Sequence, residues 1–228
     1  MCIRDRPDME ITGLTDDSRK VQPGMLFACI RGERFDGHTA AKDVLERGAA
    51  VVLADHDLGL GDRQILTEDT RALYGKLCAA WFGHPERKMR FIGVTGTNGK
   101  TTITNLIKHI LTENGHKVGL IGTIQNEIGD EIIHTDNTTP FVYDLMALYA
   151  RMAEAGCDDV VMEVSSFGLV QQRIGETHFA AAAFTNLTQD HLDYHGTMEN
   201  YYQAKKLLFQ RCDTAIIDTD DEYGKRLY

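Results

Sequence analysis

The stretch Phe91-Ile-Gly-Val-Thr-Gly-Thr-Asn-Gly-Lys-Thr-Thr102 decides the fold of the chain. It begins with strand-forming residues, continues through two glycines, and leads into a segment whose apolar residues recur at helical spacing. This order predicts a strand at residues 90–95, a tight turn at residues 96–99 and a helix at residues 100–114.

The glycine turn has the composition of a phosphate-binding loop. Glycines let backbone N–H groups turn inward around phosphate oxygens, and the helix N-terminus adds a positive dipole end. In this pattern the Lys100 ammonium reaches the β- and γ-phosphates of a nucleotide, and the Thr101 hydroxyl binds Mg²⁺. The match to G-x-x-x-x-G-K-[ST] is imperfect, because Val94 stands at the first glycine position and Gly93 lies one place early. A turn that binds nothing is the alternative, but the Gly-Lys-Thr order between a strand and a helix favours nucleotide binding.

Short apolar runs and amphipathic stretches alternate along most of the chain, which predicts an α/β fold. We expect further strands at residues 25–30, 49–54, 64–67, 117–121, 159–164, 180–185 and 214–218, helices at 39–47, 70–82, 141–155 and 198–210, and a hairpin of 123–128 with 131–135. These elements indicate a small N-terminal α/β domain followed by a larger, mostly parallel sheet with helices on both faces. The proline and charges of residues 83–88 place the boundary between domains at 11–86 and 87–228, after a disordered or artefactual start at residues 1–10.

Composition excludes several classes of protein. The chain is 43% hydrophobic and 25% charged, which is not the composition of a disordered chain. Its net charge of −10 excludes the basic surface of a protein that coats nucleic acid. No apolar run approaches the ~20 residues of a membrane span. The five cysteines form no CxxC pair and indicate reduced thiols in the cytoplasm. Residues 91–228 hold 10 basic and 19 acidic residues, so an anionic ligand there needs local devices such as metal ions.

Two acidic stretches are candidates for holding such a metal. Glu163 lies near the end of a predicted buried strand, beyond which the ligand crevice of an open α/β sheet is found; its carboxylate either holds Mg²⁺ or caps the following helix. The stretch Asp190-His-Leu-Asp-Tyr-His195 would bring His191 and His195 to one face of a helix. It is not an H-E-x-x-H zinc motif, because Leu192 occupies the Glu position. Metal ligation and a solvated polar turn fit this stretch equally well.

Two further polar segments carry no functional signal in their residues alone. Lys205 and Lys206 lie on a predicted amphipathic helix, where a lysine pair is typical of a solvated face. Asp136-Asn-Thr-Thr-Pro140 has the hydroxyl and amide groups of a helix N-cap segment, followed by a proline suited to a helix start.

Taken together, the motifs resemble those of the Mur ligase family. The resemblance covers roughly residues 11–228 and is carried by Thr95-Gly-Thr-Asn-Gly-Lys-Thr-Thr102, Asn137-Thr-Thr-Pro140, Met162-Glu-Val-Ser-Ser166, Gly168-Leu-Val-Gln-Gln-Arg173, Phe184-Thr-Asn-Leu-Thr-Gln-Asp-His-Leu-Asp-Tyr-His-Gly196 and Ala204-Lys205. The Asn-Thr-Thr and Leu-Val-Gln-x-Arg segments point to the branch that adds the third residue of the peptidoglycan stem peptide.

The resemblance implies a role for each matching residue. ATP would be bound by Gly96, Thr97, Asn98, Gly99, Lys100, Thr101 and Thr102. Mg²⁺ would be held by Thr101, Glu163, His191 and Lys205, the last as a carbamate formed with CO₂; Lys100, Lys205 and His191 would be the catalytic residues. The UDP-MurNAc-dipeptide would be contacted by Ser18, Asn137, Thr138, Thr139, Ser165, Gln171 and Arg173, and its uridine nucleotide would be held by residues 17–19 and 32–37.

The implied reaction is an ATP-dependent ligation. A substrate carboxylate attacks the γ-phosphate of ATP, and an amino acid then displaces phosphate from the acyl phosphate to form an amide. The incoming amino acid is expected to be meso-diaminopimelate, with L-lysine as the second possibility. The phosphate loop and the lysine would also fit a folylpolyglutamate synthetase-like ligase, and the loop by itself would fit a non-catalytic nucleotide-binding module. We expect a monomer without nucleic-acid or membrane partners.

The sequence departs from the family pattern at two points. Phe167 stands where the family usually has His, and Phe neither ligates a metal nor donates a hydrogen bond. The sequence also ends at Tyr228, inside the implied ATPase domain and before the family's C-terminal amino-acid-binding domain. The expectation is that this polypeptide is an N-terminal fragment that does not complete catalysis alone.

Overall fold

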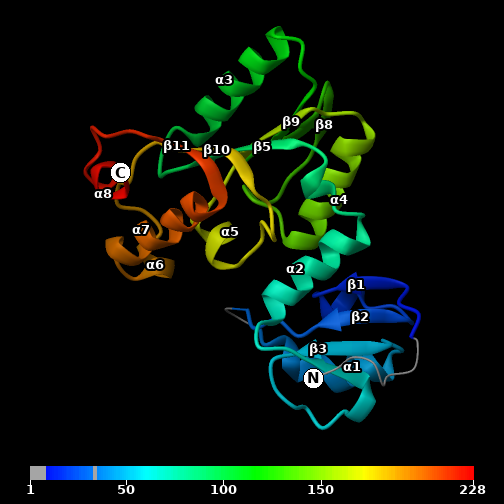
Figure 1. Ribbon diagram of the computed structural model, residues 1–228. Coiled ribbons are helices and arrows are strands. Elements are labelled where there is room, and N and C mark those ends of the chain that lie inside the picture. Colours follow the sequence, from blue (N-terminus) through cyan, green and yellow to red (C-terminus); the bar gives the residue numbers. More distant parts are fainter. Residues whose placement is uncertain (1–8, 33–34) are drawn as a thin grey trace. The chain divides into compact units, whose positions relative to one another are not determined.

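The computed structural model describes residues 9–32 and 35–228 and divides into two compact units, Met1–Cys78 and Ala79–Tyr228 (Figure 1). The start expected at residues 1–10 therefore lies almost wholly outside the described residues. The same is true of Glu33 and Arg34 in the segment expected to hold uridine. Among the described residues, no helix is both long and apolar enough to cross a membrane.

The first unit is a parallel sheet with strand order β1-β2-β3-β4. Its strands are β1 (Gly13–Thr15), β2 (Met25–Ala28), β3 (Val51–Ala54) and β4 (Gln64–Leu66), and its helices are η2 (Ser18–Lys20), η3 (Gly37–Ala40), α1 (Ala41–Glu46), η4 (Gly61–Arg63) and α2 (Thr70–Trp81), which runs past the division. Val44 and Leu45 of α1 pack on Phe27 and Val52 of the sheet in a buried core. Residues 25–30, 49–54 and 64–67 were predicted as strands and are confirmed as such over most of their lengths.

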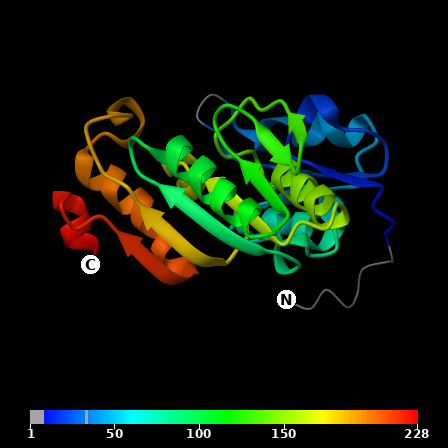
Figure 2. The ribbon, with the colours of Figure 1, turned by 90° about the horizontal axis from the view of Figure 1, so that it is seen from above.

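The second unit is built on a sheet of order β11-β10-β5-β9-β6-β7-β8. Its strands are β5 (Arg90–Thr95), β6 (Val118–Ile121), β7 (Asn126–Ile128), β8 (Glu131–Ile133), β9 (Asp159–Glu163), β10 (Phe179–Phe184) and β11 (Cys212–Ile217). Pairing is parallel from β11 to β6 and antiparallel in the β7–β8 hairpin, whose turn at Gly129-Asp130 was predicted. Figure 2 shows β10 lying between β5 and β11.

Helices cover both faces of this sheet, as predicted. They are η5 (Pro85–Arg87), α3 (Lys100–Glu113), α4 (Val142–Glu154), α5 (Ser166–Val170), α6 (Leu192–His195), α7 (Met198–Lys206), η6 (Leu207–Arg211) and α8 (Glu222–Leu227). Successive side chains of a strand point to opposite faces. Accordingly, Ile92 packs against the same cluster as Ile107 of α3, whereas Phe91 meets Tyr149 of α4 with ring centroids 4.6 Å apart.

The order of the strands marks the carboxyl end of β5 as the place where a ligand site is expected. From β5 the chain crosses through α3 to β6 and returns to β9 on the same side, but the next strand, β10, pairs with the opposite edge of β5. The strand order therefore reverses at β5, which is where open α/β sheets bind their ligands. The glycine turn follows β5 directly and lies at this point.

Candidate active site

The glycine turn needs its two glycines for different reasons. Gly96 has φ of 146°, and a Cβ there would lie 1.9 Å from Thr185 Oγ1, so no side chain fits. Gly99 has φ of 85° and open space around it; it is the N-cap residue of α3 and turns the chain into the helix. The sequence pattern thus produces a turn whose backbone lies against a neighbouring loop.

That neighbouring loop, residues 185–188, fixes the glycine turn through backbone and side-chain hydrogen bonds. Thr185 Oγ1 donates to Asn98 O at 2.7 Å, and Asn98 N donates to Asn186 Oδ1 at 3.0 Å. Thr97 N donates to Asn186 O at 2.9 Å, and Thr188 N donates to Thr97 Oγ1 at 3.0 Å. Thr185 and Asn186 occur in the family-like motif but were not predicted individually, because their contacts join segments nearly 90 residues apart.

Two lysines converge on one backbone oxygen of this turn. Lys100 Nζ donates to Gly96 O at 3.0 Å and to Thr97 O at 2.9 Å, and Lys205 Nζ donates to Gly96 O at 2.8 Å. Lys205 is 2% exposed, and its ammonium lies 4.5 Å from the centre of the Tyr201 ring. The solvated face that the residues alone indicated for Lys205 is therefore wrong, because α7 turns this side chain into the molecule; Lys206 is half-buried.

The surroundings of the two lysines lower their pKa values. Burial and, to a smaller extent, the positive charge of Lys100 lower the pKa of Lys205 to about 7, against the opposing attraction of Asp190. Burial also lowers the pKa of Lys100, against the attraction of Glu163 and Asp190. Lys205 is thus an amine with a substantial neutral fraction near neutral pH, which is the reactive form toward an electrophile such as CO₂.

Glu163 ends β9 as a buried carboxylate surrounded by donors. Its Oε1 accepts from Thr101 Oγ1 at 2.9 Å and from Thr123 N at 3.0 Å, and its Oε2 accepts from Thr123 Oγ1 at 3.0 Å. The helix cap after β9 is instead Ser165, whose side chain accepts from Gly168 N. The alternative role of Glu163 as a helix cap is therefore wrong. Thr123 was not predicted, and its contact with Glu163 leaves no local sequence signal.

The donors around Glu163 fit a hard divalent cation. Thr101 Oγ1 and the Glu163 carboxylate supply oxygen ligands of the kind Mg²⁺ prefers, at the mouth of a phosphate-type turn. A pocket of about 100 Å³ opens beside them, with Asn105, Gln125 and Glu127 in its wall. The residues present therefore suit a magnesium ion bound together with phosphate oxygens.

His191 and His195 lie in an aromatic cluster beside Lys205. His191 precedes α6 in a left-handed conformation, with φ of 52°, so the two histidines do not share a helix face. Their rings nevertheless meet the same neighbours: the Tyr201 ring centre lies 6.1 Å from that of His191 and 4.9 Å from that of His195. His195 Nε2 is 2.9 Å from Ser166 Oγ, and burial lowers the pKa of His195.

Phe167 belongs to the same cluster. Its ring lies 4.2 Å from Tyr194, 5.2 Å from His191 and 5.6 Å from His195, measured between ring centroids. Phe167 therefore replaces the polar group of the family pattern with aromatic packing that orients its neighbours.

The residues expected to contact the substrate form a second network beside Glu163. Thr139 Oγ1 donates to Glu163 O at 3.1 Å and accepts from Ser165 N at 3.0 Å. Arg173 donates to Thr139 O at 2.9 Å, to Asn137 Oδ1 at 3.4 Å, and through Nε and Nη2 to Gln171 Oε1 at 3.0 and 2.8 Å. The N-cap interpretation of residues 136–140 does not hold, because the N-cap of α4, Phe141, has no side-chain cap.

Thr138 extends this network, whereas Ser18 belongs to the other unit. Thr138 Oγ1 lies 3.0 Å from Thr123 Oγ1, so it is joined through Thr123 to the Glu163 carboxylate. Ser18 begins η2 in the first unit, next to the Asp17–Arg19 ion pair, and its carbonyl accepts from Arg47 at 2.5 Å. The predicted substrate-binding residues of the second unit therefore lie in one network, whereas Ser18 lies in the first unit.

Comparison with known proteins agrees with this arrangement. Residues 94–228 match the model of the Mur ligase middle domain, and residues 10–80 match that of the Mur ligase family catalytic domain. The chain belongs to the Mur ligase family. The family resemblance and the α/β fold expected from the sequence are thereby confirmed.

Individual Mur ligases match almost the whole chain. The UDP-N-acetylmuramoyl-L-alanyl-D-glutamate–2,6-diaminopimelate ligase of Caldanaerobacter subterraneus subsp. tengcongensis is 42% identical over 99% of this chain and 47% of its own length. The ligase of the same name from Aquifex aeolicus is 45% identical over 95% of this chain and 45% of its own length. A solved structure of a ligase with this name superposes with a TM-score of 0.83, at 32% identity, over 95% of this chain and 45% of that one. The chain spans about half the length of these relatives.

Proposed function

We propose that the protein to which this chain belongs is an ATP-dependent ligase that adds the third amino acid to UDP-MurNAc-L-Ala-D-Glu in the cytoplasm. The amino acid is diaminopimelate, in its meso form, rather than L-lysine; the names of the matched relatives include 2,6-diaminopimelate. The protein acts as a monomer in peptidoglycan precursor synthesis.

The observation that carries this proposal is the pair of contacts at the mouth of the glycine turn. Thr101 and Glu163 meet at 2.9 Å, and Lys100 and Lys205 both reach Gly96 O. Residues 96–102 hold the phosphates of ATP chiefly through the N–H groups at the start of α3, because those of Thr97 and Asn98 donate to Asn186. Lys100 neutralises charge on the transferred phosphoryl group. Thr101, Glu163, His191 and Lys205, the last carbamylated, hold Mg²⁺, which supplies electrostatic stabilisation of the phosphates.

The remaining residues orient the dipeptide substrate. Asn137, Thr138, Thr139, Ser165, Gln171 and Arg173 contact it in the second unit, and Ser18 with residues 17–19 and 32–37 holds the uridine nucleotide in the first. The substrate carboxylate attacks the γ-phosphate of ATP, and the amine of the incoming amino acid displaces phosphate from the acyl phosphate. Asn137-Thr-Thr-Pro140 and the separate N-terminal unit count against a folylpolyglutamate synthetase-like ligase.

The test is ligation by the protein extended to the length of its relatives. With ATP, UDP-MurNAc-L-Ala-D-Glu and meso-diaminopimelate we expect UDP-MurNAc-tripeptide and ADP, and no product with L-lysine or with a folate and glutamate. Lys205→Ala abolishes this activity and short carboxylic acids restore part of it, whereas the neighbouring Lys206→Ala retains it. If the two variants had equal activity, Lys205 would have no catalytic role. If product formed only with a folate and glutamate, the proposed reaction would be wrong.

A further inference from the structure

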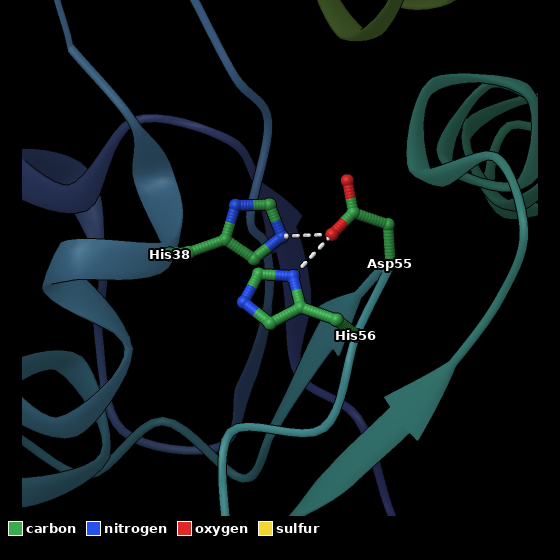
Figure 3. A group of neighbouring side chains, drawn as sticks. All are labelled: His38, Asp55 and His56. Carbon is green, nitrogen blue, oxygen red and sulfur yellow. Dashed lines mark hydrogen bonds and ion pairs between the residues drawn. The ribbon is translucent and has the colours of Figure 1, made fainter.

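Three side chains in the first unit converge on a single point that the proposed ligase reaction does not use. His38 comes from η3, and Asp55 and His56 directly follow β3. His38 Nε2 lies 3.2 Å from Asp55 Oδ1, and His56 Nδ1 lies 2.5 Å from the same oxygen (Figure 3). Within the described ranges, this is the one group that places three imidazole, thiol or carboxylate ligand atoms within 4.8 Å of one another.

His38 is oriented and desolvated like a metal ligand. Its Nδ1 lies 2.6 Å from Asp36 Oδ1, which leaves Nε2 with the lone pair when the imidazole is neutral. The side chain is 5% exposed, and Nε2 has no aligned hydrogen bond even though Asp55 lies within contact distance. A carboxylate behind one ring nitrogen and a bare second nitrogen is the arrangement that positions histidine on a metal.

The spacing and the charge of the group suit a tetrahedral dication. Zinc–ligand distances of about 2.0–2.1 Å separate neighbouring ligand atoms by about 3.3 Å, close to the His38–Asp55 distance. His56 is half exposed and needs to withdraw from Asp55 by less than about 1 Å to reach the same spacing. Asp36 and Asp55 carry two negative charges, of which the Arg31 guanidinium, 3.2 Å from Asp36, offsets one.

We propose that His38, Asp55 and His56 form a binding site for a Zn²⁺-class transition-metal ion, with Asp36 as the residue that positions His38. Two imidazoles and one carboxylate leave a fourth position, which water fills on the exposed side of Asp55 and His56. Imidazole ligands select Zn²⁺, Co²⁺, Ni²⁺ or Cu²⁺ over Mg²⁺, so this site is chemically distinct from the oxygen-rich one at Glu163.

The experiment is a calorimetric titration of the 228-residue chain with ZnCl₂ in chelator-free buffer containing excess Mg²⁺, repeated with CoCl₂ and visible absorption. The site predicts one ion per chain and Co²⁺ bands typical of tetrahedral coordination. His56→Ala, which alters an exposed side chain, removes this binding event. The matched control is His178→Ala, because His178 pairs with Asp213 at 2.7 Å on the surface and belongs to no group of three ligand residues within the part of the chain that the structure describes.

The positioning role of Asp36 has its own readout. Asp36→Asn weakens Zn²⁺ binding by roughly 10–100-fold while the stoichiometry stays at one. Unchanged affinity in His56→Ala, an equal loss in His178→Ala, or absence of binding to the wild-type chain would overturn the proposal. In that case His56 is hydrogen-bonded to Asp55, His38 only lies beside it, and the cluster binds no metal. Far-UV circular dichroism of each variant separates lost ligation from lost folding.

Discussion

The Lys205 ammonium shares Gly96 O with the Lys100 ammonium and is almost fully buried, so its charged form is costly. The folded-state pKa of about 7 lies below the ordinary value of 10.5, so the unfolded chain binds more protons than the folded chain between these values. The Lys205 contribution therefore makes the free energy of unfolding rise with pH from about 7 toward 10.5.

We predict that Lys205→Met removes this pH dependence. The wild-type slope attributable to Lys205 is at most about 1.4 kcal/mol per pH unit, and the variant lacks it because no proton is bound at that position. Urea denaturation in CO₂-free buffer at several pH values measures the slope, and Lys206→Met is the control that keeps it. Parallel pH profiles for wild type and Lys205→Met would show that Lys205 titrates normally.

Glu163 is the second residue whose charge matters. Glu163→Gln keeps the size of the side chain but removes the charge that the donors of Thr101 and Thr123 face. Hydrogen bonds to a charged group contribute about 1.5–3 kcal/mol, so we expect ATP affinity in the presence of Mg²⁺ to fall by roughly 10–100-fold. Calorimetry with and without Mg²⁺ measures this, with Glu131→Gln in β8 as the control. If Mg²⁺ strengthened ATP binding to Glu163→Gln as much as it does to the wild type, Glu163 would not be a ligand of the metal.

At the scale of the element, the turn between β5 and α3 is stabilised by its close approach to residues 185–188. Gly96→Ala forces a methyl group onto Thr185 Oγ1, whereas Gly99→Ala meets open space and strains only its left-handed backbone. We predict that Gly99→Ala costs about 1–2 kcal/mol of unfolding free energy and that Gly96→Ala costs more, because backbone strain and overpacking add. Chemical denaturation compares them, and equal costs would mean that residues 185–188 move aside freely.

Most of the elements that sequence reasoning predicted have long periodic signals, although the three-residue strands β4, β7 and β8 were predicted as well. Continuous apolar runs predict β5 and β9, and α3 and α4 are long enough to show a periodic apolar face. Short elements such as β1 and α6 were missed, because three or four residues carry no period. The helix predicted at residues 198–210 tightens into the 3₁₀ turn η6 after Lys206.

Site residues divide in the same way. Lys100 and Thr101 follow from a local motif, whereas the contacts of Thr123 with Glu163 and of Tyr201 with Lys205 arise only when distant segments meet or a helix turns inward. The helix pattern also did not predict which of the two adjacent lysines is buried, because their side chains are identical. In the structure Lys205 is buried and Lys206 is more exposed.

At the scale of the whole molecule, the net charge and the proposed ligand have the same sign. Residues 91–228 carry nine more acidic than basic residues, 19 against 10, yet the glycine turn gathers Lys100, Lys205 and the N-terminus of α3. The local positive field at the end of β5 therefore has to outweigh the overall charge for ATP to bind.

The most direct test of the proposed ATP site is a calorimetric titration of the 228-residue chain with ATP in the presence of Mg²⁺, alongside Lys100→Met. We predict one ATP per chain, binding that is stronger with Mg²⁺ than without it, and loss of most of the affinity in Lys100→Met. Equal affinities of wild type and Lys100→Met would contradict the assignment of residues 96–102 as the phosphate-binding loop.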